Sequence, residues 1–381
     1  MRKPDSPIVL VGNYPPDKQH SMLQYAAMLQ TEFRQMGMDV HHTAPSVAFG
    51  RFNPGNKWLG YLDKLLLHPR KLKQTIQQQG GTCIVHVCDH SNSPILKAAR
   101  HQRTLLTCHD LIAVRSALGE FPGELPRLSG RLLQSTIRKS IPLADHIACV
   151  SAATQQDLHA VIPTTSGRTS VVHNGFNAPY QRQPASIVEE QLAGLGIPDQ
   201  SPILLHVGSN AWYKNRLGVL KILQAYKELS GNQEAHLVLA GPELDPEQAA
   251  FVQKQALAHQ VTCTGPLEHA QLEALYCKAS VLIFPSRHEG FGWPPVEAQS
   301  CGCPVVASRN GSLAEVVGQS APTAEWDDTN SHAQALLRIL NEPTYRQDLV
   351  EKGYRNATRF SARKMAEAFI DIYCELEATA A

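Results

Sequence analysis

The chain has 381 residues, which is enough for two domains with separate hydrophobic cores. Its 35 Lys and Arg residues nearly balance its 34 Asp and Glu residues and give a formal net charge of +1. Nucleic-acid-binding domains are usually markedly basic, so this balance argues against nucleic acid as a partner.

Cysteine usage and the lengths of the apolar runs bear on the compartment. The nine cysteines include no C-x-x-C pair, and most lie in apolar, strand-like runs, where Cys behaves as a small buried hydrophobe. An odd number without a disulfide framework predicts a reducing, cytoplasmic location. The first apolar run, residues 8–11, is too short for a signal peptide, and no run approaches the ~20 residues that span a bilayer. We therefore expect a soluble or peripheral protein.

Short apolar runs alternate with segments of helical period, which is typical of α/β folds with parallel sheets. A first series of strands is expected at residues 8–11, 39–43, 83–87, 105–108, 147–150 and 170–173. A second series is expected at residues 203–207, 236–240, 261–264, 281–284 and 305–307. Helices are expected in the first half at residues 21–36, 60–79, 126–142 and 152–160. The stretch 179–202 is rich in Pro and Gly, so we predict that it connects a domain of residues 1–178 to one of residues 203–360.

Polar side chains follow two strands of the first series. Gly12 and Asn13 come after the first strand, and Asp89, His90 and Asn92 come after the strand at 83–87. Ligands gather at the carboxyl ends of strands in open α/β sheets, so we expect these residues to line a ligand cleft.

A metal site is a second interpretation of the same place. Alternation along the strand puts His86, Cys88 and His90 on one face, and these side chains can bind zinc. No further ligand is evident elsewhere in the sequence, and we predict that the protein has no metal site.

The segment KWLGYLDKLLLHPRKLK, residues 57–73, mixes leucines and aromatic residues with basic residues. It has two interpretations. One is a core helix with a solvated polar face. The other is a basic amphipathic surface that makes a peripheral contact with an anionic membrane.

The second series of strands begins with a candidate phosphate site. Gly208 and Ser209 end its first strand, and Lys214 and Arg216 stand near the start of the next helix. A glycine at a strand end followed by a basic residue at a helix start can hold a pyrophosphate. Gly241 ends the next strand in the same way.

The stretch VLIFPSRHEGFGWPPVEAQSCGCPVVAS, residues 281–308, reads as strand, loop, helix and strand. Pro295 and Val296 are expected in the first helical turn, which proline favours. Glu289 lies in the glycine-rich loop, and Glu297 lies just inside the helix, where unpaired amides and the helix dipole also attract phosphate. Taken alone, a Glu at this position is commonly a cap. The pair of carboxylates suits a ligand with both hydroxyls and phosphates, such as a nucleotide sugar.

This string resembles the donor-sugar motif of the retaining glycosyltransferases of family 4, in which seven residues separate a loop Glu from a helix Glu. Glu289 and Glu297 have that spacing. Further positions that match the motif are Pro285, Ser286, Gly290, Phe291, Gly292, Ala298, Gly302, Pro304 and Val305.

The resemblance covers nearly the whole chain and implies the GT-B architecture, with two Rossmann-like domains that face each other across a cleft. The N-terminal domain would bind the acceptor and the C-terminal domain the donor. The closing helix, within residues 361–381, would cross back to the first domain. The implied reaction transfers a sugar from a nucleoside diphosphate sugar to a hydroxyl, with retention at the anomeric carbon. It uses no cofactor and no metal.

The resemblance also implies roles for individual residues. Glu297 would bind the ribose, Glu289 the sugar hydroxyls, and Lys214 the diphosphate. The His-Asp pair that begins at His109 matches one that the family often carries, and its His would contact the donor sugar. Further donor contacts are expected from Gly208, Ser209, Gly241, Pro266, Leu267, His288, Gly290, Phe291 and Gly292.

Two positions depart from the family pattern. Many members have a glycine pair where this chain has only Gly12, and Tyr213 stands where Arg is usual, which leaves Arg216 as a substitute. Two alternatives therefore stay open: a non-catalytic protein that binds nucleotide sugars, and a nucleotide-sugar epimerase of the same architecture. The acceptor would be a glycan, a lipid-linked molecule or a small molecule. The expected location is the cytoplasm, with the inner face of the membrane as a second site if residues 57–73 bind lipid.

Overall fold

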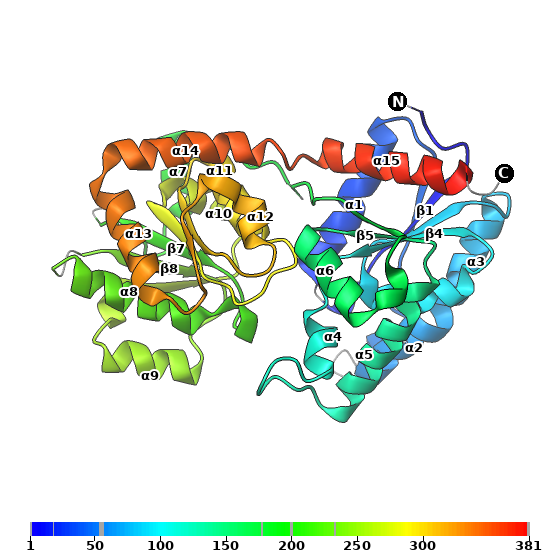
Figure 1. Ribbon diagram of the computed structural model, residues 1–381, viewed down its shortest axis with the longest axis horizontal. Helices are drawn as coiled ribbons and strands as arrows, with labels where there is room; N and C mark the ends of the chain where they lie inside the picture. The colour runs from blue at the N-terminus through cyan, green and yellow to red at the C-terminus, as the bar shows by residue number, and fades with distance from the viewer. Residues whose placement is uncertain are drawn as a thin grey trace. The chain divides into compact units, whose positions relative to one another are not determined.

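The computed structural model describes residues 2–17, 19–52, 57–176, 178–198, 201–231 and 234–378. The chain divides into two compact units, Met1–Asn177 with Ser361–Ala381, and Ala178–Phe360. Each unit is an α/β domain built on a parallel sheet of six strands (Figure 1).

The first unit has the strand order β2-β1-β3-β4-β5-β6. Its inner strands are buried and largely apolar because helices cover both faces of the sheet, whereas the edge strands β2 and β6 are more polar. Since the strand order reverses after β2, right-handed connections put α1 on one face and the following helices on the other. Helices α3, α5 and α6 share one core with η4, whereas α1 packs with α15 through Phe33 and Tyr373. The strands are β1 (Ile8–Val11), β2 (Val40–Thr43), β3 (Ile84–Val87), β4 (Arg103–Cys108), β5 (His146–Cys149) and β6 (Thr169–Val171).

Helices of the first unit fill the connections between these strands. The α-helices are α1 (His20–Gln35), α2 (Lys57–Leu62), α3 (His68–Gln78), α4 (Ile112–Ala117), α5 (Leu128–Ser140), α6 (Ala152–Val161) and α15 (Ala362–Ala378). Short helices of other types are η1 (Pro15–Asp17), η2 (Gly50–Phe52), η3 (Asp63–Leu67), η4 (His90–Ala98), η5 (Ile141–Leu143) and η6 (Pro163–Thr165).

The second unit has the strand order β12-β11-β10-β7-β8-β9. Helices α7, α10, α11 and α12 bury one face of this sheet, and α8, α9, α13 and α14 bury the other. The order reverses between β7 and β10, which makes the carboxyl ends of these two strands the expected place for a ligand. The strands are β7 (Ile203–Val207), β8 (His236–Ala240), β9 (Val261–Gly265), β10 (Val281–Phe284), β11 (Val305–Ser308) and β12 (Thr323–Ala324).

The helices of the second unit alternate with its strands. They are α7 (Ala185–Leu192), α8 (Arg216–Leu229), α9 (Pro246–Lys254), α10 (His269–Lys278), α11 (Trp293–Ser300), α12 (Leu313–Val317), α13 (Thr329–Asn341) and α14 (Pro343–Ala357). Short helices are η7 (Trp212–Lys214), η8 (Ala258–Gln260) and η9 (Gly318–Ser320).

The strand predictions are confirmed, because each expected strand is present and its ends lie within two residues of the predicted ones.

Three details differ from the expectations. Residues 60–79 form a helical run interrupted by the π-turn η3, just before Pro69, which has no N–H to donate to the carbonyl of Leu65. The stretch 179–202 contains α7, whose Val188 and Leu192 pack in the core of the second unit. Helix α11 begins at Trp293, two residues before Pro295, so Glu297 lies in its second turn.

Candidate active site

Two loops at the carboxyl edge of the second sheet bring Lys214 and Glu289 together. Lys214 ends η7 after β7, and Glu289 lies in the loop after β10. The Lys214 Nζ donates to both carboxylate oxygens of Glu289, at 2.8 and 3.0 Å. Both side chains are largely buried, with 18% and 8% of their side-chain surface exposed. The pair is therefore a well-defined bidentate contact at the strand ends.

Asn215 holds these two loops in register. Its side-chain amide donates to the carbonyl of Pro285, after β10, at 2.9 Å and to the carbonyl of Trp326 at 3.0 Å. Its backbone is left-handed, with φ of 56°, which turns the chain from η7 into α8. The loop after β10 has a second support in Ser312, whose hydroxyl donates to the carbonyls of Glu289 and Phe291. The ion pair is fixed from both sides.

Glu297 lies on α11, and its side chain is buried. Its Oε2 accepts a hydrogen bond of 2.9 Å from the hydroxyl of Tyr276 on α10. Burial raises the pKa of Glu297 to about 7, although the Tyr276 hydrogen bond and the charge of Lys214 oppose the rise. The carboxyl therefore changes its charge near neutral pH.

Glycines let the ends of β7 and β8 approach closely. Gly241, after β8, has φ of 150°, and a Cβ there would overlap the carbonyl oxygen of Gly208. Gly208 in turn donates its N–H to the carbonyl of Ala240 at 3.1 Å. Ser209 next to it is exposed, as expected for a residue that can contact a ligand.

Arg216 does not share the arrangement of Lys214. It is 2% exposed, and its guanidinium donates to Asn210 Oδ1 and to the carbonyl of Pro242, the latter at 2.8 Å. These bonds pin the loops after β7 and β8 to the start of α8. Since Arg216 is almost fully buried whereas 18% of the Lys214 side chain is exposed, the geometry favours Lys214, not Arg216, as the cation that meets a diphosphate.

The remaining predicted donor residues lie near the same sheet edge. Pro266 and Leu267 follow β9, and α10 begins two residues later after a capping box formed by Glu268 and Gln271. His288 and Gly290 flank Glu289 in the loop after β10. Phe291 is buried against Trp293 and Phe360, and Gly292 ends the loop with φ of 92°.

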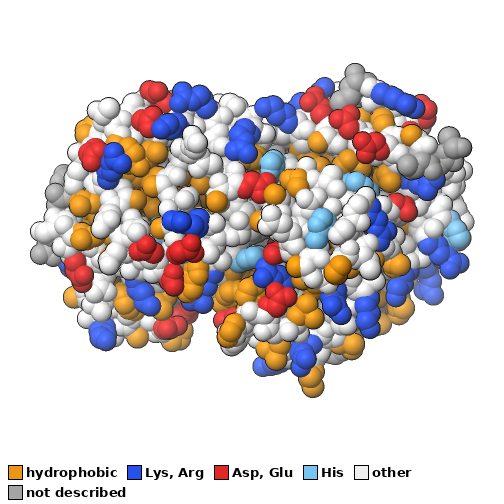
Figure 2. All heavy atoms as spheres, in the orientation of Figure 1, with side chains coloured by type: hydrophobic (Ala, Val, Ile, Leu, Met, Phe, Trp, Pro, Cys, Tyr) orange, Lys and Arg blue, Asp and Glu red, His pale blue; other side chains and the backbone are white. Residues whose placement is uncertain are grey.

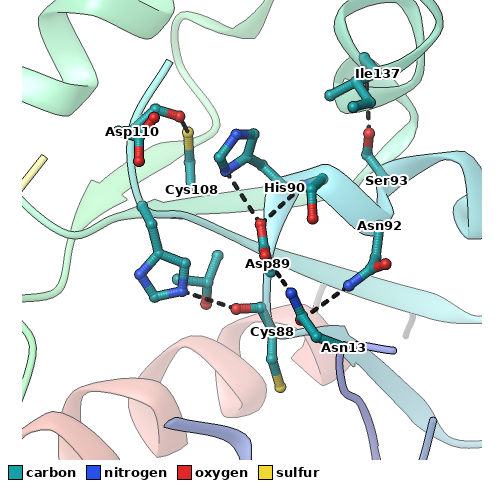
Figure 3. Close-up of polar contacts among 12 residues, drawn as sticks. Asn13, Cys88, Asp89, His90, Asn92, Ser93, Cys108, Asp110 and Ile137 are labelled. Carbon is teal, nitrogen blue, oxygen red and sulfur yellow. Dashed lines mark hydrogen bonds and ion pairs between the residues drawn. The ribbon is translucent and has the colours of Figure 1, made fainter. Parts of the chain in front are cut away.

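The cleft residues that the sequence predicts in the first half of the chain form a separate network in the first unit (Figure 3). The Asn13 side-chain amide donates to Asp89 Oδ2 at 2.5 Å and to Gln19 Oε1 at 2.6 Å. Its oxygen accepts from Asn92 at 2.9 Å. His90 Nδ1 lies 3.3 Å from Asp89 Oδ1. The structure thus brings these predicted residues together at the carboxyl ends of β1 and β3.

Asp89 carries a buried negative charge in this network. Burial would raise the pKa of its carboxyl, but His90, His109 and the hydrogen bonds from Asn13 and Ser91 together hold the pKa below its ordinary value. Asp89 also starts η4, since its Oδ1 accepts from the N–H of Ser91 at 2.8 Å. Gly12, which precedes Asn13 after β1, lies against the His42 side chain. A Cβ at position 12 would overlap the His42 imidazole, so the close approach needs glycine.

His109 follows β4 in the same unit and is 6% exposed. Its Nε2 donates to the carbonyl of Cys88 at 2.9 Å, and Tyr25 packs edge-on against the ring. Burial lowers the pKa of His109, although the Asp89 charge opposes this. The Nε2 of His109 carries a proton, because the carbonyl oxygen of Cys88 can only accept.

His86 is occupied by other contacts. One ring nitrogen lies 2.6 Å from the Tyr373 hydroxyl and the other 2.7 Å from the Thr107 hydroxyl. Within the ranges that the structure describes, no group of three or more His, Cys, Asp or Glu side chains is arranged to hold a metal ion.

Comparisons with known proteins identify the family of this chain. The family model of the glycosyl transferases group 1 matches residues 188–356, and that of Glycosyltransferase Family 4 matches residues 22–178. Together they cover most of both units. The chain belongs to the family 4 glycosyltransferases.

Individual relatives of this glycosyltransferase are distant. The O-antigen chain mannosyltransferase B of Escherichia coli is 26% identical over 283 residues, which cover 72% of this chain and 71% of that protein. A sucrose-phosphate synthase from Thermosynechococcus elongatus has a TM-score of 0.76 at 21% identity and covers 98% of this chain and 100% of its own. The Anabaena protein HepE, in complex with UDP-glucose, has a TM-score of 0.70 at 16% identity and covers 97% and 100%. The chain spans about two thirds of the length of the curated relatives that it matches. The solved structures establish the GT-B fold.

Sequence reasoning missed the support that Tyr276 and Asn215 give to the site of this glycosyltransferase. Tyr276 lies 21 residues before Glu297, and no spacing rule links them. Asn215 could have been noticed, since Asn takes a left-handed conformation more readily than most residues, but its partners could not.

The first prediction concerns Glu297→Gln and the free energy of unfolding. The folded protein holds the Glu297 proton up to a pKa of about 7, against an ordinary value of 4.5. The stabilisation of the folded state by the protonated Glu297 is therefore fully present below pH 4.5. It is lost as the pH rises from 4.5 through 7, so the free energy of unfolding falls over that range. The variant should gain up to about 3 kcal/mol over the parent at pH 8 and nothing at pH 4. Urea unfolding at both pH values measures this, and equal gains at both would contradict it.

The second prediction concerns Arg216→Ala. The change removes the guanidinium of a residue that is 2% exposed, together with its hydrogen bonds to the Pro242 carbonyl and the Asn210 side chain, which should cost about 1–3 kcal/mol of unfolding free energy. Lys221→Ala, an exposed position on the same helix, is the matched control and should cost almost nothing. If Arg216→Ala unfolded like the control but bound donor poorly, Arg216 would belong to the diphosphate site.

Proposed function

We propose that this glycosyltransferase moves a sugar from a nucleoside diphosphate sugar to a hydroxyl group, with retention at the anomeric carbon. The observation that carries the proposal is the contact between Lys214 and Glu289 at the strand ends of the second unit. A cation and a carboxylate held there can meet the diphosphate and the sugar hydroxyls of one ligand. The Anabaena neighbour HepE forms a complex with UDP-glucose, which supports a nucleotide sugar here.

In the proposed reaction the bond between the anomeric carbon and the diphosphate oxygen breaks, and negative charge grows on that oxygen. The acceptor oxygen bonds to the anomeric carbon on the same face of the sugar, and its proton passes to the leaving phosphate. Lys214 would stabilise the growing charge, because a preorganised cation acts most strongly where charge develops. The reaction as proposed uses no metal ion.

The other residues have positioning roles in this proposal. Glu289 would hold sugar hydroxyls and so orient the anomeric carbon. Glu297 would accept hydrogen bonds from the ribose hydroxyls, for which its ionised form is suited. His109 is proposed to contact the donor sugar. Gly12 and the network of Asn13, Asp89, His90 and Asn92 are proposed to contact a glycan, lipid-linked or small-molecule acceptor; their placement at the carboxyl ends of β1 and β3 supports this.

Transfer can be tested with donor hydrolysis, because a glycosyltransferase without acceptor often passes the sugar slowly to water. A panel of nucleoside diphosphate sugars is incubated with the protein, and release of the nucleoside diphosphate is measured. Turnover of one donor supports the proposal. Binding of a donor, detected as a rise in Tm, without any turnover of it in the presence of acceptor candidates would favour a non-catalytic binding protein.

The third prediction concerns Lys214→Ala. An interaction that strengthens in the transition state lowers kcat when it is removed, beyond any effect on KM. Loss of one such contact lowers the rate by ~100-fold. Lys221→Ala is the matched lysine control and should turn over like the parent. Hydrolysis at saturating donor measures both, and an unchanged kcat for Lys214→Ala would place the diphosphate elsewhere.

The fourth prediction concerns nucleotide binding by Glu297→Gln. The amide keeps a group that can accept from Tyr276 but loses the charge that favours hydrogen bonds from ribose hydroxyls. We expect an affinity for the nucleoside diphosphate about tenfold lower at pH 8, since a hydrogen bond to a charged group contributes about 1.5 kcal/mol or more. Below pH 6 the difference should shrink, because the parent carboxyl is then protonated. Calorimetric titration at both pH values checks this; equal affinities at pH 8 would refute the ribose role.

A further inference from the structure

Large hydrophobic side chains are exposed unevenly on the two units. Among the described residues thirteen such side chains are exposed, and eleven of them belong to the first unit. The second unit contributes only Ile187 and Leu229 to this set within the described ranges. Single exposed apolar residues are ordinary, but a concentration on one unit indicates an interaction surface.

Helix α5 provides the most exposed part of this surface. Leu128 is 80% exposed and Leu132 is 71% exposed, and their spacing of four residues puts them on one side of the helix. Leu125, just before the helix, is 54% exposed. The opposite side of α5 carries Leu133 and Ile137, which pack in the core of the first unit. The core therefore does not account for the outward leucines.

Basic side chains accompany the outward leucines of α5. Arg127 and Arg131 are exposed next to Leu128 and Leu132, and Lys139 is exposed two turns later. The helix itself has no acidic residue. A helix surface of leucines and cations without carboxylates matches an anionic, partly apolar partner.

A second group of the same composition lies on α2, η3 and the start of α3. Leu62, Leu65 and Leu66 are exposed there, although a core helix with a solvated polar face would bury them. The neighbouring cations Arg70, Lys71 and Lys73 are exposed as well. Of the two interpretations of residues 57–73, the burial pattern favours the amphipathic surface.

The two groups belong to one layer of the first unit. Helices α3 and α5 both pack against η4 and share its core, so their outward sides face away from the same face of the first sheet. Figure 2 shows hydrophobic and Lys or Arg side chains intermingled at the lower end of this unit, where α4, α5 and α2 lie in Figure 1. A single extended partner can therefore contact both groups.

We propose that this layer docks onto a lipid bilayer that contains anionic lipids. Leucines of α5 and η3 would insert at the boundary between head groups and acyl chains, while arginines and lysines contact head-group phosphates. A protein partner fits less well, since protein interfaces are enriched in aromatic residues and depleted of Lys, whereas α5 presents leucines without any aromatic side chain. The proposal does not rest on sugar transfer and extends beyond residues 57–73 to α5.

The test is co-sedimentation of the full chain with vesicles of phosphatidylcholine, with and without phosphatidylglycerol, at low and high salt. The parent should bind the vesicles that contain phosphatidylglycerol and lose that binding as salt rises. Leu128→Gln with Leu132→Gln removes two inserted side chains and should lower the partition coefficient by roughly 100-fold. Ile187→Gln with Leu229→Gln, the exposed apolar pair of the second unit, is the matched control and should bind like the parent.

Two further measurements keep the outcome clear. Arg127→Gln with Arg131→Gln should reduce the preference for phosphatidylglycerol and flatten the salt dependence. All three double variants change exposed side chains, so their Tm and donor hydrolysis should match the parent. If neither the parent nor any variant hydrolysed a donor but the parent still bound the vesicles, the result would count against the proposed sugar transfer and not against membrane docking.

Three results would overturn the membrane proposal. The first is no binding by the parent to either kind of vesicle at low salt. The second is parent-like binding by the variant that lacks Leu128 and Leu132. The third is a dimer in light scattering that the same variant converts to a monomer, because the leucines would then contact a second copy of the chain.

Discussion

Asn215 joins the two loops on which the candidate donor site depends. Its left-handed backbone ends η7, and its side chain bonds the carbonyls of Pro285 and Trp326. Asn tolerates this conformation better than most residues with a Cβ. Lys214 precedes it directly, and Glu289 lies four residues after Pro285. A largely buried ion pair needs both loops in fixed register, since a misplaced partner would leave a buried charge unpaired. The fold thus sets the distance between cation and carboxylate before any ligand is considered.

The sequence predicts the sheets well because buried parallel strands are short runs of Val, Ile and Leu between polar loops. Such runs mark β1, β7, β8 and β10 to the residue. The prediction fails where the pattern carries little information. Strand β12 has two residues and no apolar run. The sequence pattern places the start of α11 too late, because Gly292 and the two prolines after Trp293 are typical of a loop. The first turn of a helix nevertheless tolerates Pro294 and Pro295, and α11 begins at Trp293.

Much of the candidate site is visible in the sequence, because its residues follow strands whose carboxyl ends share one edge. Asn13, Asp89 and Asn92 are in contact for this reason. Contacts between helices are not visible in this way. Tyr276 on α10 bonds Glu297 on α11, and Arg216 on α8 bonds the carbonyl of Pro242. The packing and direction of these helices decide such contacts, and spacing along the chain does not reveal them. The outward leucines of α5 are also hidden in the sequence, since a helix pattern does not tell which apolar side meets the core.

A double-mutant cycle on donor binding tests the pairing of Lys214 and Glu289 most directly. Affinity for the turned-over donor is measured by calorimetry for the parent, Lys214→Ala, Glu289→Gln and the double variant. Residues in contact that bind one ligand should show an interaction energy of about 1 kcal/mol or more. Additive effects within about 0.5 kcal/mol would mean that the two residues act independently, and the donor site would then not be built on this pair.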